Sequence, residues 1–170
     1  MKDILLIGGG GHCRSCIDVI EEEKKYNIAG IVDNNIPLGT DVLGYKIIGN
    51  DSDLEVLRSS YSYAFITVGQ IKNASVRKKL FEFAVKLGFD VPRIVSPRAF
   101  VSRHATIDKG TIVMHDALIN ASASIGKNCI INTKSLIEHD ATIKDHCHIS
   151  TGAIINGSVL VGEESFIGSG

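Results

Sequence analysis

The sequence lacks the long apolar run, the one-sided charge and the dense cysteine framework that mark several protein classes. No apolar stretch approaches the roughly 20 residues that a helix needs to span a bilayer, so we expect no membrane insertion. Lys and Arg number 18 and Asp and Glu number 19, which gives a net charge of −1. A near-neutral chain offers no electrostatic footprint for nucleic acid or for an anionic membrane.

An export signal is also missing from the N-terminus. The stretch "MKDILLIGGGGH" has too short an apolar core, and no small-residue cleavage site, for a signal peptide. The four cysteines are too few for a disulfide framework, so we expect a protein of the reducing cytoplasm. Cys13 and Cys16 have the spacing of a metal or redox motif but no second pair, which favours two small helix residues.

Residues 1–97 alternate between strand-like and helix-like segments. The predicted strands are "DILLIG" (3–8), "IAGIVD" (28–33) and "SYAFITVG" (62–69), and the predicted helices are 12–26 and 73–88. Asn73 is a candidate cap for the second helix, and Gly88 suits its end. Strands that alternate with helices predict a parallel sheet with crossover helices, about half of a dinucleotide-binding fold.

From Ala99 to Gly170 the sequence repeats every six residues, in twelve hexads without a gap. The third position of every hexad is Ile or Val, and the first is always Ala, Ser, Thr, Cys or Val. This period predicts a parallel β-helix in which each hexad forms one side of a three-sided prism, so that twelve hexads make four coils. We therefore expect an α/β Rossmann-like half domain over 1–97 and a β-helix domain over 98–170.

The glycine-rich turn "IGGGGH" follows the first predicted strand and opens the first predicted helix. Backbone N–H groups at such a turn favour phosphate. Asp33, at the end of the second predicted strand, is a candidate to bind a ribose hydroxyl. A nicotinamide cofactor is conceivable, but the third glycine of the dinucleotide motif is replaced by Cys13 and the domain is short. A tight strand–helix turn without a ligand is the alternative.

The segment "SLIEHDATIKDHCHIS", residues 135–150, concentrates histidines and acids within the hexads. His139 and Asp140 fall at hexad positions five and six, where the chain turns a corner and side chains reach outward. A histidine that a carboxylate orients is a good general base. The alternative is a surface histidine with acidic neighbours. The spacing of His139, His146 and His148 does not suit a metal site, and we expect His115 and His146 to be surface groups.

These features together resemble the bacterial hexapeptide-repeat N-acetyltransferases that act on nucleotide-linked 4-amino sugars, and their relatives described as sialic acid O-acetyltransferases. The resemblance rests on "IGGGGH", the "VD" after the second strand, "ITVG", and hexads that contain "IEHD" and "HIS". It implies a left-handed β-helix and a homotrimer that uses acetyl-CoA in glycan biosynthesis, without a metal. Such proteins usually continue for further coils and a short tail, so the resemblance implies that this chain is truncated at Gly170.

The resemblance also implies roles for individual residues. His139 would be the general base and Asp140 its orienting partner, while Asn132, His148 and Gly157 would contact acetyl-CoA, His148 across a subunit interface. The sugar nucleotide, linked to UDP or GDP, would lie against the glycine-rich turn, with the following residues lining its pocket: Gly8, Gly9, Gly10, Gly11, His12, Asp33, Asn34 and Gly69. We therefore predict an acetyl-CoA-dependent N-acetyltransferase. The alternatives are O-acetylation of a sialic acid and a non-catalytic trimer that binds sugar nucleotides.

Overall fold

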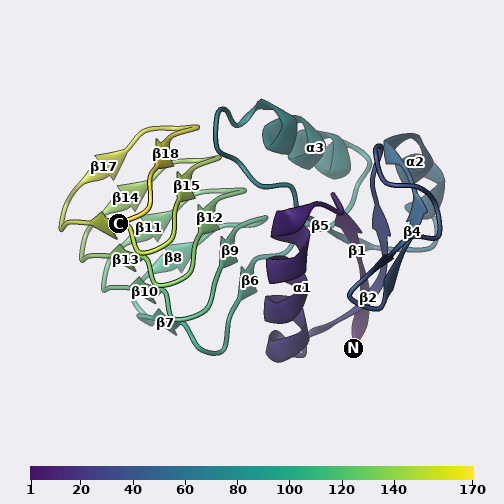
Figure 1. Cartoon of the computed structure of the whole chain (residues 1–170). Helices are drawn as coiled ribbons and strands as arrows, with labels where there is room; N and C mark the ends of the chain where they lie inside the picture. Colours follow the sequence, from purple (N-terminus) through teal and green to yellow (C-terminus); the bar gives the residue numbers. More distant parts are fainter. The chain divides into compact units, whose positions relative to one another are not determined.

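The computed structural model describes residues 1–170 and divides into two compact units (Figure 1). The first unit comprises Met1–Gly69 and Val76–Pro92, and the second comprises Gln70–Ser75 and Arg93–Gly170. The short segment Gln70–Ser75 thus belongs with the hexads, although it lies between two elements of the first unit in the sequence.

The first unit is built on a five-stranded sheet in the order β3-β4-β2-β1-β5. Its strands are β1 (Lys2–Ile7), β2 (Tyr26–Val32), β3 (Asp41–Val42), β4 (Tyr45–Gly49) and β5 (Tyr63–Ile66). All neighbouring strands are parallel except β3, which pairs with β4 in an antiparallel hairpin. The predicted parallel sheet is confirmed, but the sequence analysis missed β3 and β4.

The helices of this unit are α1 (Gly11–Glu23), α2 (Leu54–Leu57) and α3 (Ser75–Lys86), with a short 3₁₀ helix, η1 (Asp51–Asp53), before α2. The crossover α1 ends three residues before the predicted end, because Lys24 adopts a left-handed conformation with φ 56° and the chain enters β2. At α3, Asn73 accepts a hydrogen bond from Ser75 N at 3.1 Å, and Gly88 with φ 88° follows its end. No helix has both the length and the apolar character needed to cross a membrane.

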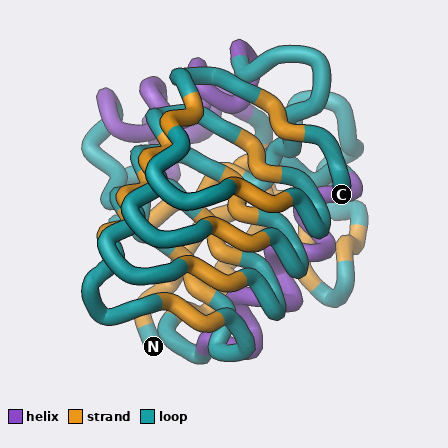
Figure 2. The backbone as a smooth tube through the Cα atoms, turned by 90° about the vertical axis from the view of Figure 1, so that its left-hand side faces the viewer, coloured by secondary structure: helices purple, strands orange, loops and turns teal.

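The second unit is a left-handed parallel β-helix, as predicted. Its strands are β6 (Ile94–Val95), β7 (Phe100–Val101), β8 (Thr106–Ile107), β9 (Ile112–Val113), β10 (Leu118–Ile119), β11 (Ser124–Ile125), β12 (Ile130–Ile131), β13 (Leu136–Ile137), β14 (Thr142–Ile143), β15 (His148–Ile149), β16 (Ile154–Ile155), β17 (Leu160–Val161) and β18 (Phe166–Ile167). They form three sheets, β16-β13-β10-β7, β17-β14-β11-β8 and β18-β15-β12-β9-β6. Each strand pairs with the strand 18 residues away, for example Leu118 with Leu136, so one coil is three hexads (Figure 2).

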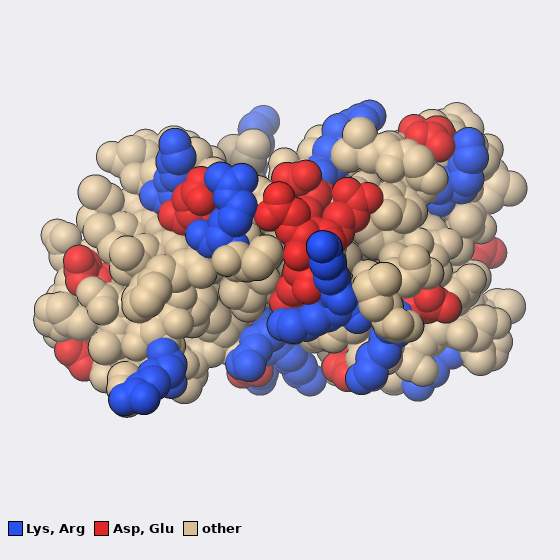
Figure 3. Space-filling model, turned by 90° about the horizontal axis from the view of Figure 1, so that it is seen from below, with Lys and Arg blue, Asp and Glu red and all other residues tan.

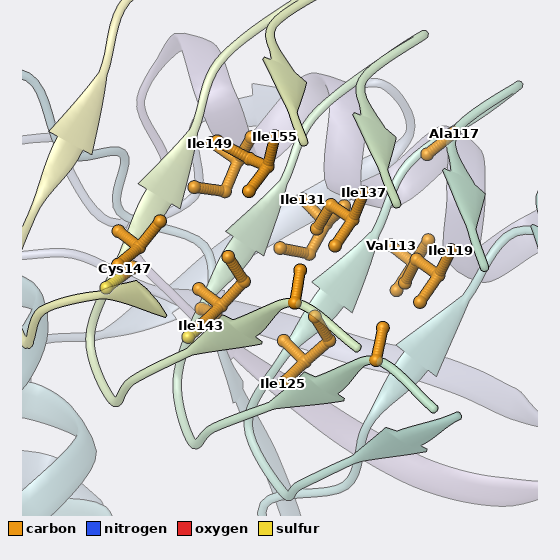
Figure 4. Packing of buried hydrophobic residues seen from close by; sticks show 14 of the residues in the cluster. Val113, Ala117, Ile119, Ile125, Ile131, Ile137, Ile143, Cys147, Ile149 and Ile155 are labelled. Carbon is orange, nitrogen blue, oxygen red and sulfur yellow. The ribbon is translucent and has the colours of Figure 1, made fainter. Parts of the chain in front are cut away.

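The hexad positions explain how each coil is built. Third-position side chains such as Ile119, Ile137 and Ile155 stack along the inside of the β-helix and are almost fully buried (Figure 4). The sixth position turns the corner in a left-handed conformation, as at Asp140 with φ 59°. The corner that carries His139 and Asp140 at positions five and six faces outward, and both side chains are exposed.

On the face that Figure 3 draws, several acidic side chains form a group, and Lys and Arg side chains lie directly beside it. Both signs of charge therefore occur side by side there, in keeping with the near-neutral net charge of −1. The chemistry of the chain therefore depends on local constellations of side chains rather than on one extended field.

Candidate active site

The predicted His139–Asp140 pair lies at the corner that follows β13. Asp140 Oδ2 is 2.8 Å from His139 Nδ1, and the two side chains are 62% and 58% exposed. A carboxylate can only accept, so His139 carries its proton on Nδ1 and keeps Nε2 as a proton acceptor. The structure thus brings the two residues together in the arrangement of an oriented general base.

The electrostatic setting of His139 strengthens that base. The pKa of His139 is raised above its ordinary value, chiefly by the hydrogen bond to Asp140, with further contributions from the charges of Asp140 and Glu138. Glu138 is a site residue that sequence reasoning missed. Its Oε2 accepts from Asn120 Nδ2 at 2.9 Å and from His139 N at 3.3 Å. The signal was available, because Asn120 and Glu138 occupy the same hexad position 18 residues apart.

Gly157 lies directly against the His139 ring, one coil further along. A Cβ at Gly157 would come within 2.8 Å of both Cε1 and Nε2 of His139. Real Cβ atoms do not approach other atoms so closely, so only glycine leaves the imidazole in this position. The geometry therefore connects Gly157 with the predicted base as well as with the predicted cofactor groove.

Asn132 and His148 meet on a different face of the β-helix. Asn132 Nδ2 lies 3.1 Å from His148 Nε2, and His148 Nδ1 contacts the carbonyl oxygen of Gln70. A carbonyl only accepts, so His148 donates from Nδ1 and accepts from Asn132 at Nε2. His148 is 7% exposed, and its ring meets that of Phe166 in a T-shaped contact with centroids 5.2 Å apart. Within one chain, Asn132 and His148 lie apart from His139, because they belong to the sheet that contains β12 and β15, whereas His139 follows β13.

The prediction that His146 is a surface group is wrong. Its side chain is 8% exposed, and its Nδ1 lies 3.0 Å from Asn128 Nδ2. Gln70 Nε2 also donates to the backbone carbonyl of His146 at 2.9 Å. Burial follows from the segment Gln70–Ser75, which packs with the β-helix and which the hexad pattern does not reveal. His115, by contrast, is partly exposed and bonds Ser96 Oγ through Nδ1 at 2.7 Å.

The glycine-rich turn of the first unit is held by Asp33. Its carboxylate accepts from the backbone N–H groups of Gly9 at 2.7 Å, Asn35 at 2.7 Å and Ile36 at 3.1 Å. Gly8 has φ 108°, and a side chain there would collide with Val68, so this position requires glycine. Gly10 is the N-cap of α1, and Gly11 is its first residue. Asp33, predicted to bind ribose, therefore also ties the turn to the end of β2.

Two adjoining pockets lie at the carboxyl ends of the parallel strands. The smaller, of about 110 Å³, is lined by Gly8, Val68 and Asp33 among others, and lies at the ends of the neighbouring strands β1 and β5. The carboxyl ends of parallel strands are where open α/β sheets bind ligands. The larger, of about 400 Å³, shares Asp33 and Asn34 with it.

The remaining predicted pocket residues are also near the turn. Gly69 approaches His12, because a Cβ on Gly69 would lie 3.4 Å from His12 Cβ. Asn34 exchanges two hydrogen bonds with Asp51, at 2.6 and 2.9 Å. Sequence reasoning missed Asp51 and the rest of the wall that the β3–β4 hairpin and η1 supply.

The thiols and the acidic groups form no further reactive cluster. No group of three or more His, Cys, Asp or Glu side chains is arranged to hold a metal ion. Burial raises the pKa of the Cys13 thiol to about 11 and raises that of Cys16 as well, so both remain protonated. Cys129 and Cys147, one coil apart, are buried free thiols of the β-helix core.

Known proteins share this architecture along nearly the whole chain. The family model of the PglD N-terminal domain matches residues 3–83. A histidine-to-asparagine mutant of perosamine N-acetyltransferase from Caulobacter crescentus, solved with CoA and GDP-perosamine, is 32% identical. The match covers 98% of this chain and 77% of that one, with a TM-score of 0.90. The chain belongs to the hexapeptide-repeat nucleotide-amino-sugar N-acetyltransferases.

Two further members of this N-acetyltransferase family also match the chain. The acetyltransferase domain of PglB from Neisseria gonorrhoeae FA1090, solved with acetyl coenzyme A, is 31% identical. It matches over 99% of this chain and 80% of its own, with a TM-score of 0.89. PerB from Caulobacter crescentus, solved with CoA and GDP-perosamine, is 27% identical. The match covers 99% of this chain and 87% of that one, with a TM-score of 0.85. No curated protein matched the sequence. The predicted family and the predicted enzyme class, an acetyltransferase, are confirmed.

Proposed function

We propose that this protein transfers the acetyl group of acetyl-CoA to the amine of a nucleotide-linked amino sugar, with His139 as general base. The observation that carries the proposal is the exposed His139–Asp140 pair, whose Nδ1–Oδ2 distance of 2.8 Å leaves Nε2 free to take a proton. The relatives solved with acetyl-CoA or with CoA and GDP-perosamine support this substrate pair.

In the proposed reaction His139 Nε2 removes a proton from the sugar amine as its nitrogen attacks the thioester carbonyl. A C–N bond forms, the C–S bond breaks, and the CoA thiolate takes the proton back from the imidazolium. Asp140 stabilises the imidazolium and fixes the tautomer. The amine attacks the acetyl group directly, so no acyl-enzyme intermediate is needed.

The two substrates are assigned to the two units. The sugar nucleotide would lie along the glycine-rich turn and the adjoining pockets, against Gly8–Gly11, His12, Asp33, Asn34 and Gly69. Acetyl-CoA would contact Asn132, His148 and Gly157. Because His139 follows β13 whereas Asn132 and His148 lie on the β12/β15 sheet, a groove shared between neighbouring copies in a homotrimer would bring all three to one thioester.

The test is acetyl transfer by the purified protein to a panel of GDP- and UDP-linked 4-amino sugars and sialic acid, followed by mass spectrometry. We expect an acetylated amino-sugar product with the wild type. The His139→Asn variant keeps the hydrogen-bonding shape and loses the proton acceptor, so its kcat should fall by about 10² to 10⁴.

His104→Asn is the matched control, because His104 is an exposed histidine at another corner of the same β-helix. It should leave the rate unchanged. A folded His139→Asn enzyme that turns over at the wild-type rate at neutral pH would show that His139 is not the base. If sialic acid were the only compound acetylated, the acceptor group would be a hydroxyl rather than an amine.

A further inference from the structure

The larger pocket of the first unit is lined by both apolar and polar residues. Its volume of about 400 Å³ is within the usual range for small-molecule sites. Ile36, Leu38 and Ile47 are among its apolar lining residues, and Asn50 and Asp53 are among its polar ones. No Lys or Arg lines it. A flat ring with a hydrogen-bonding edge suits such a pocket.

Most polar groups around the pocket are already committed within the chain. The Asp33 carboxylate accepts from three backbone N–H groups, and Asn34 is paired in both directions with Asp51. Their hydrogen bonds shape the pocket and leave little capacity to read a base.

Asn50 and Asp53 differ, because each keeps one group that the chain does not use. Asn50 Oδ1 accepts from Ser52 N at 2.9 Å and from Ser52 Oγ at 2.6 Å, while Asp53 Oδ2 accepts from Asn50 N at 2.8 Å. This capping box at the start of η1 fixes both side chains. The Asn50 amide N–H groups and Asp53 Oδ1 remain, so the two side chains of this capping box offer one donor and one acceptor group.

That pattern matches one nucleobase better than the other. Guanine presents an acceptor, O6, next to two donors, N1–H and N2–H₂, which an amide N–H and a carboxylate complement together. Uracil presents a single N3–H between two carbonyl oxygens, so one of its oxygens would face the Asp53 carboxylate. A site built to pair with donors discriminates strongly against a base that lacks them.

We propose that Asn50 and Asp53 read the Watson–Crick edge of guanine, so that the enzyme selects a GDP-linked over a UDP-linked sugar. The inference rests on the proposed function, which gives the nucleotide to this unit. The pocket shares Asp33 and Asn34 with the smaller pocket beside Gly8. A base in the larger pocket therefore leaves its diphosphate within reach of the glycine-rich turn.

Calorimetric titration of the full chain with GDP and with UDP tests the selection. We expect GDP to bind about 10- to 100-fold more tightly, the effect of one or two hydrogen bonds to a charged group. Equal affinity, or tighter UDP binding, would overturn the inference and leave the proposed function standing. Binding of neither nucleotide would overturn both.

The Asp53→Asn variant separates base reading from folding. The amide oxygen can keep the hydrogen bond from Asn50 N, while the amide nitrogen replaces Asp53 Oδ1 and opposes the donors of guanine. Xanthine carries a carbonyl where guanine carries its 2-amino group, so the variant should now prefer xanthosine diphosphate to GDP.

The Asp41→Asn control removes the same charge from an exposed position outside the pocket, and should leave the GDP affinity unchanged. If Asp53→Asn binds GDP as tightly as the wild type and shows no gain for xanthosine diphosphate, Asp53 does not read the base.

Discussion

His139 owes its basicity to residues on either side of it in the chain. The pKa of its imidazole is raised first by the hydrogen bond to Asp140 and then by the charges of Asp140 and Glu138. A general base must be neutral to act, so a raised pKa makes Nε2 a stronger base and moves the rise of activity to higher pH.

Replacement of Asp140 by Asn should shift the pH profile of kcat/KM. Without the carboxylate the pKa of His139 falls, so the acidic limb should move to lower pH, while the plateau rate falls because the base is weaker and its tautomer less well fixed. The amine of the substrate adds its own limb, which is the same for both enzymes and cancels in the comparison. Glu138→Gln should shift the limb in the same direction by less. An acidic limb that stays in place in Asp140→Asn would mean that His139 does not govern it.

At the scale of the coil, stacking sets the place of the His139 ring, the proposed general base. Ser158 N donates to His139 O at 3.0 Å, and this hydrogen bond holds the coil of Gly157 against the coil of His139. The His139 ring therefore fills the space that a side chain at Gly157 would occupy. The exposed imidazole can swing away, so the effect of a larger residue falls on geometry rather than on stability.

Gly157→Ala should lower kcat by about 10², the cost of displacing a catalytic group by about 1 Å. Its melting temperature should stay near that of the wild type, because the displaced ring is free to move into solvent. Gly168→Ala is the control, since a Cβ at Gly168 meets nothing within 4 Å, and it should retain full activity. A fully active Gly157→Ala enzyme would show that this contact does not position His139.

The elements that the sequence predicted are those whose signal is local and repeated. Ile or Val at each third hexad position points inward whatever the rest of the chain does, so the period alone predicts three sides per coil. The pair His139–Asp140 could be predicted from the sequence for the same reason. The hairpin of β3 and β4 was not, because β3 has two residues and Gly44 interrupts the apolar pattern.

The contacts that could not be predicted join segments far apart in the sequence. Gln70 bonds to His148 across 78 residues and to the carbonyl of His146 across 76, and no periodicity reports such a pairing. The burial of His146 follows from it. The pair Asn50 and Asp53 could not be predicted for the same reason, since the two residues line a pocket only when β4 joins the sheet.

On the scale of the whole molecule, the three faces of the β-helix differ in what their second hexad positions present. On the β16-β13-β10-β7 sheet these residues are Ile154, Leu136, Leu118 and Phe100, apolar throughout, and Ile154 and Phe100 are each 60% exposed. The neighbouring sheet presents Thr106, Ser124 and Thr142, with Leu160 at its end. A continuous apolar row on a water-exposed face marks an interaction surface.

We expect that row to form the contact between copies in the proposed homotrimer. Each of the three copies would offer the row to its neighbour around a closed threefold axis, and the corner after β13 that carries His139 borders the same sheet. Sedimentation at micromolar concentration should therefore give the mass of three chains. The double variant Phe100→Glu, Ile154→Glu should sediment as a monomer and lose acetyl transfer, because the groove between copies would open.

Leu43→Glu, which places the same charge on an exposed residue of the first unit, should remain trimeric and active. A wild-type protein that sediments as a monomer while it transfers acetyl groups would show that one chain completes the site alone, and that the row has another use.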